Sequence, residues 1–186
     1  MRNLVLFMHI SLDGFTARAD GAMNWIKVSD EIFEYAHDRI QVTDTALYGR
    51  KTFEMMDAYW PTAADKPDAS KHDIEHSTWY KKVLKYVVSE KTILQETDKI
   101  KLISDDVKER ILDLKKQEGG EIIMFGSPGL ARYLMAEGLV DEYWLFVNPI
   151  ILGAGIPLFA NVEIKLTLKK STTLANGVVG LHYIKE

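Results

Sequence analysis

The sequence LYGRKTFE (Leu47–Glu54) joins a short apolar run to a segment of helix-forming residues. Gly49, Arg50, Lys51 and Thr52 occupy the junction. A helix that begins at such a junction presents free backbone N–H groups and the positive end of its dipole, and both suit phosphate oxygens. Glycine allows close approach to the backbone, and arginine adds a bidentate donor. The stretch is therefore typical of a strand-to-helix turn, and it is a candidate phosphate site.

Two further turns have a similar composition. Residues 89–92 (SEKT) and 126–129 (GSPG) each follow an apolar run that we expect to be a strand. In open α/β sheets, ligands bind outside the carboxyl ends of the strands. One such turn alone is usually only a connection, and neither G-x-G-x-x-G nor G-x-x-x-x-G-K-[ST] occurs here. Together, the helix starts near residues 50 and 127 predict a binding site for the two phosphates of a dinucleotide.

The remaining pattern alternates strands and helices and ends in a hairpin around Asn176-Gly177, a strong turn signal. It predicts an α/β fold in a single domain, 1–186. We expect a central mixed, mostly parallel sheet with helices on both faces and a C-terminal antiparallel hairpin. Strands are expected at 4–10, 45–48, 86–89, 99–104 (an edge), 121–125, 141–152, 165–173 and 178–184. Helices are expected at 30–40, from 51, at 105–118 and from 128, with a loop at 60–70.

Composition excludes several classes of protein. The chain has 186 residues, 47% hydrophobic and 27% charged, with a net charge of −4 and no cysteine. The acidic balance argues against a nucleic-acid partner, and the lack of cysteine excludes disulfides and thiolate metal sites. The apolar run at the amino terminus is too short for a signal peptide or a membrane span. We expect a cytoplasmic protein without a membrane partner.

Several histidines and tryptophans have a structural interpretation. His72 and His76 stand four residues apart, but no H-E-x-x-H motif surrounds them, so we expect a solvated segment and no metal site. His9, in the first strand, is expected to be a core histidine. The apolar strand 142–151 should be buried on both faces and could serve a homodimer, which we expect. Core packing is expected for most of the tryptophans, Trp25, Trp60, Trp79 and Trp144.

The segment GRKTFE resembles the G-R-x-T motif of the dihydrofolate reductases, and AMNW (22–25) and IIMFGS (122–127) resemble two of their other segments. The chain is still more similar to the reductase domain of the bacterial bifunctional riboflavin-biosynthesis deaminase-reductase. The motifs run in the same order over nearly the whole chain, which implies a three-layer dihydrofolate reductase-like fold. They are SLDGF (11–15), GSPGLARYLMAEGLVDE (126–142), NPIILGAGIPLF (148–159) and NGVVGLHY (176–183).

The resemblance implies reduction by NADPH. It places the adenosine ribose near Ser89. The following position is often basic in the family but is Glu90 here, which would repel a 2′-phosphate unless Lys91 or Arg50 compensates; NADH therefore stays open. The resemblance places the pyrophosphate at Gly49, Arg50, Lys51 and Thr52, a second phosphate turn at Gly126, Ser127, Gly129 and Leu130, and the substrate near Ser11, Asp13, Gly14 and Trp25.

Two aspartates are candidates for the acid that assists hydride transfer. Asp30 lies five residues after Trp25, as the acid does in the dihydrofolate reductases. Asp13 lies in SLDG, where the riboflavin-type reductases have an aspartate in the substrate pocket. We favour Asp13, because an acid in the first turn of a helix stabilises that helix whatever its function.

The expected substrate is a small heterocycle of pterin or ribosylaminopyrimidine type. The deaminase that usually accompanies the riboflavin reductase has H-x-E and P-C-x-x-C motifs, and a chain without cysteine cannot supply them. Three hypotheses follow: an NADPH-dependent reductase of a pterin or pyrimidine, the riboflavin-pathway reductase itself, or a catalytically silent nucleotide-binding module of the same fold.

Overall fold

The computed structural model describes residues 1–91 and 95–186. Its main sheet has eight strands in the order β5-β4-β3-β6-β1-β7-β10-β9. The strands are β1 (Leu4–Ser11), β3 (Thr43–Gly49), β4 (Leu84–Val88), β5 (Ile100–Ile103), β6 (Glu121–Met124), β7 (Glu142–Asn148), β9 (Leu166–Thr173) and β10 (Val179–Lys185). A second sheet pairs β2 (Phe15–Ala17) with β8 (Ile156–Pro157).

The body of the main sheet is parallel. Strands β5, β4, β3, β6, β1 and β7 each pair in parallel with the next one, whereas β10 pairs antiparallel with both β7 and β9. The carboxyl ends of the parallel strands therefore share one edge of the sheet. The mixed sheet, the edge position of β5 and the closing hairpin were all predicted, and all are confirmed.

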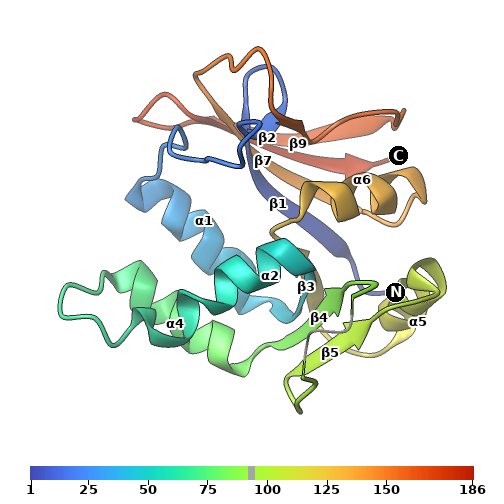
Figure 1. The fold of residues 1–186 in the computed structure, drawn as a ribbon. Helices are drawn as coiled ribbons and strands as arrows, with labels where there is room; N and C mark the ends of the chain where they lie inside the picture. Colours follow the sequence, from blue (N-terminus) through green and yellow to red (C-terminus); the bar gives the residue numbers. More distant parts are fainter. Residues whose placement is uncertain (92–94) are drawn as a thin grey trace.

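Helices cover both faces of this sheet (Figure 1). The side chains of Leu4, Leu6 and Met8 pack with α5 and α6, and that of Phe7 packs with α1, α2 and α4. The strand period of two thus sends alternate residues of β1 into two separate cores. The helices are α1 (Asp30–Gln41), α2 (Arg50–Asp57), α3 (Trp60–Ala63), α4 (Lys71–Lys82), α5 (Val107–Lys116) and α6 (Pro128–Ala136).

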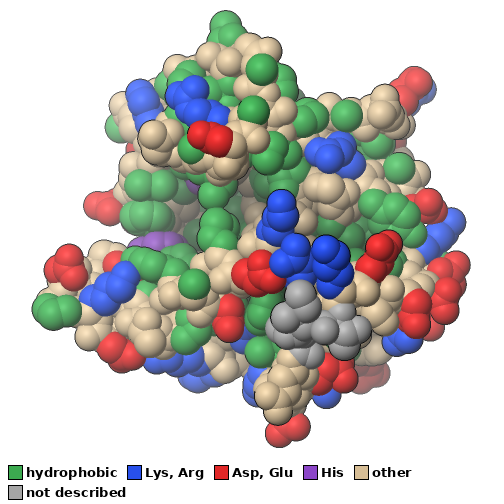
Figure 2. Space-filling model, viewed as in Figure 1, with side chains coloured by type: hydrophobic (Ala, Val, Ile, Leu, Met, Phe, Trp, Pro, Cys, Tyr) green, Lys and Arg blue, Asp and Glu red, His purple; other side chains and the backbone are tan. Residues whose placement is uncertain are grey.

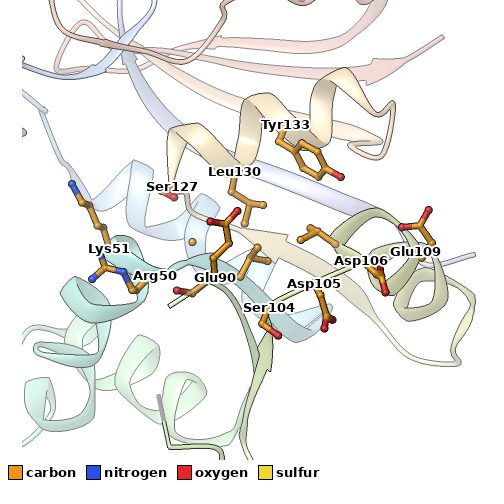
Figure 3. Close-up of a pocket in the computed structure, with 14 residues that line it drawn as sticks. Arg50, Lys51, Glu90, Ser104, Asp105, Asp106, Glu109, Ser127, Leu130 and Tyr133 are labelled. Atoms are coloured by element: carbon orange, nitrogen blue, oxygen red, sulfur yellow. The ribbon is translucent and has the colours of Figure 1, made fainter. Parts of the chain in front are cut away.

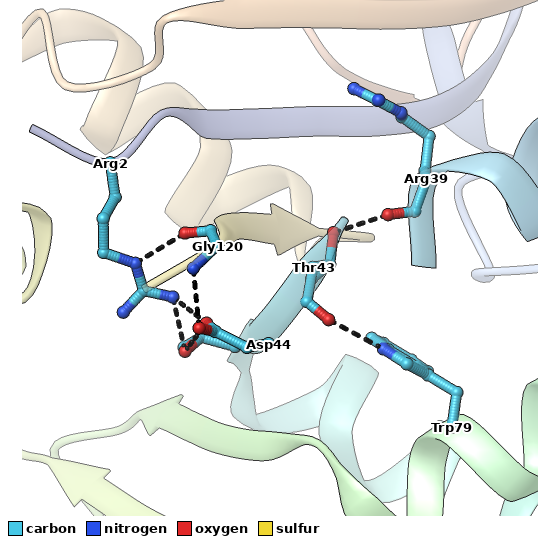
Figure 4. A network of polar contacts seen from close by, with 7 residues as sticks. Arg2, Arg39, Thr43, Asp44, Trp79 and Gly120 are labelled. Carbon is cyan, nitrogen blue, oxygen red and sulfur yellow. Dashed lines mark hydrogen bonds and ion pairs between the residues drawn. The ribbon is translucent and has the colours of Figure 1, made fainter. Parts of the chain in front are cut away.

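A polar network closes the opposite edge of the sheet, at the amino ends of β1 and β3 (Figure 4). The buried Arg2 guanidinium donates to the Gly120 carbonyl oxygen at 2.7 Å and pairs with Asp44. Asp44 also accepts the Gly120 amide at 2.7 Å. The network ties the turn between α5 and β6 to the amino ends of β1 and β3.

Three predictions at single segments were wrong. Residues 60–63 form the short helix α3 instead of a loop, because proline is tolerated in the first turn of a helix. Strand β7 ends at Asn148, before Pro149. His76 lies on α4 but is buried with 3% exposure, within aromatic contact of Trp60 and Phe125, so the expected solvated segment is a core face.

Other expectations for single residues are confirmed. Trp25 is buried, and Trp60, Trp79 and Trp144 pack against the core on the α1 side. Strand β7 is buried on both faces, since Tyr143 and Phe146 belong to different cores. In the described part of the chain, no helix is long and apolar enough to cross a membrane.

Candidate active site

The two predicted phosphate turns lie side by side. They follow β3 and β6, which pair in parallel, and the Gly49 amide donates to the Gly126 carbonyl oxygen at 3.2 Å. From these turns α2 and α6 leave toward opposite faces of the sheet. Divergent connections after adjacent parallel strands open a crevice between them, and this is where α/β sheets bind ligands.

The second turn is packed against the first and against β1. Gly126 has a φ of +128°, which favours glycine, and the Gly126–Ser127 peptide is cis. A Cβ atom at Gly126 would lie 3.1 Å from Thr52 Oγ1 and 3.8 Å from Met8 Cε. Thr52, which we expected to bind phosphate, is buried beneath this turn.

A cleft of about 650 Å³ opens at the two helix starts (Figure 3). Figure 2 shows Lys and Arg side chains gathered over the start of α2, beside a hollow bordered largely by hydrophobic side chains. The cleft has the size of a small-molecule site. Its lining comes from Gly49, Arg50, Lys51, Val88, Ser89, Glu90, Ser104, Asp105, Asp106, Val107, Glu109, Ser127, Leu130 and Tyr133.

Both helix starts are open toward a ligand. The N-cap residues, Gly49 for α2 and Ser127 for α6, have extended backbones and give no side-chain cap hydrogen bond. First-turn N–H groups without a side-chain cap are free for an anion. These two starts, held together through Gly49 and Gly126, fit the two phosphates of a dinucleotide.

The third predicted turn is built differently. The Ser89 hydroxyl accepts the Lys91 amide at 3.1 Å, and no helix begins within residues 89–91. Thr92 lies outside the described residues. Ser89 and Glu90 line the cleft, whereas Lys91 is exposed and is not part of the lining.

The predicted substrate residues Ser11, Asp13 and Gly14 lie outside this cleft, at the carboxyl end of β1. The Ser11 hydroxyl donates to Asp13 Oδ1 at 2.7 Å. Asp13 also accepts the Leu152 amide at 3.1 Å and the Gly153 amide at 2.8 Å. The Ser11 hydroxyl, and after it these amides, lower the pKa of Asp13 against an opposing effect of desolvation. Asp13 therefore holds the loop after β1 to the loop that contains Leu152 and Gly153.

Asp30 has a different environment. It is exposed at the first position of α1 and makes no side-chain hydrogen bond or ion pair with a described residue. It is one of the residues that line a second pocket of about 410 Å³ between α1 and α4. Phe33 and His72 stack in the wall of this pocket with ring centroids 4.0 Å apart. Asp30 is thus the freer of the two aspartates.

His9 is held in β1 by Asn148. The Asn148 side-chain oxygen accepts the Lys27 amide at 2.8 Å, so the side-chain nitrogen lies on the His9 side, 3.3 Å from Nδ1. His9 Nδ1 must then accept a hydrogen bond from the Asn148 side-chain nitrogen, which places the proton of a neutral ring on Nε2. Burial lowers the pKa of His9 to about 4. The expected core histidine is confirmed as a partly buried, neutral one.

The structure brings most of the predicted coenzyme residues together and holds the substrate residues apart from them. Gly49, Arg50, Lys51, Ser89, Glu90, Ser127 and Leu130 share the cleft. Trp25 is buried, and its Nε1 has no partner among described residues. Sequence reasoning missed the side contributed by β5 and α5, although the predicted edge strand at 99–104 ends at the same sheet edge. That side consists of Ser104, Asp105, Asp106, Val107 and Glu109.

Comparisons with known proteins agree with this geometry. Residues 2–180 match the family model for the RibD C-terminal domain. The Bacillus subtilis (strain 168) protein YyaP is 34% identical over 98% of this chain and 94% of its own length. A putative riboflavin biosynthesis protein from Shewanella sp. PV-4 superposes with a TM-score of 0.73 at 22% identity, covering 100% of this chain and 99% of that chain.

Enterococcus faecalis dihydrofolate reductase, solved with NADP(H) and RAB-propyl, superposes with a TM-score of 0.66 at 12% identity over 99% of this chain and 96% of that chain. The family model covers nearly the whole sequence, and the structural match extends over 99% of this chain. By sequence this chain belongs to the RibD C-terminal domain family, and its fold is that of the dihydrofolate reductases.

Proposed function

We propose that this chain is a reductase that uses a nicotinamide dinucleotide to reduce a small flat heterocycle of pterin or ribosylaminopyrimidine type. One observation carries the proposal: two helix starts without side-chain caps, joined by the hydrogen bond from Gly49 to Gly126, open into one cleft. When bound, the coenzyme supplies the hydride. The resemblance implies NADPH, and a dihydrofolate reductase of the same fold was solved with NADP(H).

The chain's own residues set the orientation. The helix starts at Gly49 and Ser127 hold the diphosphate, so one half of the coenzyme extends over β4 and β5 and the other toward β1. Met8 on β1 adjoins the Gly126 turn, which supports a position of the nicotinamide half near the carboxyl end of β1. The substrate then lies on the α1 side of that strand, where the half-buried Phe125 packs edge-on against Phe7.

Asp30, rather than Asp13, is the proposed donor of the proton that the substrate takes up during hydride transfer. A carboxyl group that donates a proton needs an oxygen free to meet the substrate, and a lowered pKa works against donation. Asp13 has a lowered pKa, and its oxygens are occupied by Ser11, Leu152 and Gly153. Asp30 has no such partners, and it faces a pocket.

Loss of absorbance at 340 nm tests the proposal. The purified chain is mixed with NADPH or NADH and a panel of dihydropterins and aminopyrimidines. We expect turnover on at least one member of the panel. Coenzyme binding without any turnover would instead identify a catalytically silent nucleotide-binding module. Failure to bind either coenzyme would remove the proposed function altogether.

A further inference from the structure

The cleft continues beyond the two helix starts, away from β1. Its far part is lined by residues that follow β4 and β5 and by the start of α5. In the sheet order, β4 and β5 lie on the side of β3 opposite to β6 and β1. If the diphosphate lies at the two helix starts and the nicotinamide toward β1, the far part receives the adenosine half. This placement rests on the proposed function.

The far part of the cleft is acidic. Arg50 and Lys51 lie at one end of the cleft, Asp105, Asp106 and Glu109 lie at the other, and Glu90 points toward Leu130 between them (Figure 3). Four carboxylates thus face two cations within one lining: Glu90, Asp105, Asp106 and Glu109 against Arg50 and Lys51.

Ion pairs already engage one cation and one carboxylate of this lining. The Arg50 guanidinium already pairs with Glu54 at 2.6 Å, and Asp105 pairs with Arg110 at 2.8 Å. Glu90 pairs with no cation among the described residues. Lys91, the other candidate to offset its charge, is exposed and does not line the cleft. Glu90 therefore presents to the adenosine half a carboxylate without an ion-pair partner among the described residues, and Lys51 lies at the other end of the lining.

We propose that this cleft selects the dinucleotide without a 2′-phosphate, NADH over NADPH, and that Glu90 is the specificity-determining residue. Its carboxylate accepts a hydrogen bond from the free 2′-hydroxyl of the adenosine ribose. A carboxylate just beyond a strand end binds the ribose in this way in NAD-binding sheets, whereas an arginine accommodates the 2′-phosphate.

The charges explain the direction of the selection. A 2′-phosphate carries close to two negative charges at neutral pH, and each carboxylate within a few ångströms repels it. The 2′-hydroxyl carries no charge and can donate to the same carboxylate. One group thus favours one coenzyme and disfavours the other, which is how specificity arises from an attractive and a repulsive element together.

Equilibrium binding tests the inference independently of turnover. NADH and NADPH are titrated separately into the purified chain, and heat or quenching of tryptophan fluorescence gives each Kd. For the native chain we expect NADH to bind at least about tenfold more tightly, which corresponds to about 1.4 kcal/mol. Salt should reduce the ratio of the two Kd values, because it screens the repulsion of the exposed Glu90.

Variants of the exposed Glu90 locate the effect. Glu90→Gln should reduce the preference severalfold, mainly by improving NADPH binding, and Glu90→Lys should reverse it. Glu118→Gln is the matched control: Glu118 is exposed and follows α5 at the opposite edge of the sheet, and its loss changes the net charge equally. We expect this control to keep the native ratio.

The outcomes separate two failures. Equal affinities, or tighter NADPH binding by the native chain, would overturn the selection and leave the dinucleotide site standing. A native preference that Glu90→Lys does not alter would remove Glu90 from the role. Binding of neither coenzyme would end the proposed function, and this inference with it.

Discussion

The backbone of Gly49 packs so closely on Ser127 that a Cβ atom at residue 49 would lie 1.9 Å from the Ser127 Oγ. The same Cβ would lie 3.1 Å from the Ser127 Cβ and 3.3 Å from its backbone nitrogen, so a new serine rotamer would relieve only the first contact. The glycine of LYGRKTFE is thus required by the packing of the neighbouring turn, whatever the ligand.

Gly49→Ala should therefore lower the free energy of unfolding by about 2 kcal/mol, because overpacking forces the two turns apart. Gly129→Ala is the matched control, because Gly129 lies in α6 and a Cβ atom added there would have no neighbouring atom within 4 Å. There, alanine should stabilise by about 0.5 kcal/mol through helix propensity. Urea denaturation measures both, and equal stabilities for the two variants would contradict the packing argument.

Asp13→Asn and Asp30→Asn should have different effects. An asparagine at 13 has one acceptor oxygen instead of two, so amide exchange at Leu152 and Gly153 should become faster. The pH dependence of hydride transfer in Asp13→Asn should keep its native shape.

Asp30→Asn should slow hydride transfer about a hundredfold and remove the part of its pH dependence that reports the acid. Single-turnover kinetics over a range of pH, with hydrogen exchange, tests both. A changed pH profile in Asp13→Asn alone would return the acid to Asp13.

His76 should make the protein less stable in acid. Burial, and next the charge of His72, lower its pKa from 6.5 to about 3. Above pH 6.5 neither the folded nor the unfolded chain binds the proton, and below it only the unfolded chain does so until the pH approaches 3. Stability from this group is therefore complete above pH 6.5 and is lost progressively as the pH falls. Between pH 7 and pH 5 the loss should be about 2 kcal/mol.

His76→Phe should remove this part of the pH dependence and keep the aromatic contacts. Tyr80→Phe is the control on the same helix: it loses the hydroxyl contact with Asp57, 3.1 Å away, and should cost about 1 kcal/mol at both pH values. Denaturation at pH 7 and pH 5 measures the two slopes. A His76→Phe slope equal to the native one would show that other groups cause the acid sensitivity.

The buried ion pair between Lys115 and Asp141 should respond unequally to loss of either partner. Their side chains lie 2.5 Å apart and are 5% and 28% exposed. Asp141→Asn leaves an ammonium group buried beside the Leu139 carbonyl and should cost about 3 kcal/mol. Lys115→Met leaves the Asp141 carboxylate, which water reaches and which still accepts a hydrogen bond from the Leu4 amide. A loss of about 1 kcal/mol in the free energy of unfolding is therefore expected. Equal losses would contradict this account.

The sequence determined what depends on local pattern. The alternation of strand and helix patterns and the Asn176-Gly177 turn predicted the strands, the helices and the hairpin, because these signals act within a few residues. The glycine turns at 49 and 126 also predicted where the cleft opens, since parallel strands end at one edge. The segment around Pro61 was misjudged because proline is tolerated in the first turn of a helix. The buried face of α4 was misjudged because the packing of His76 against Phe125 and Trp60 outweighs a polar composition.

Only the tertiary structure decided which groups face each other. Sequence places Glu90 and Asp105 fifteen positions apart (105 minus 90), and Asp13 is more than a hundred residues from Gly153, yet each pair shares one site. The acidic far part of the cleft and the engagement of Asp13 by two loops follow from strand order and loop packing. These are long-range properties, and hydrogen-bond geometry and charge act through space, so no local pattern along the chain encodes them.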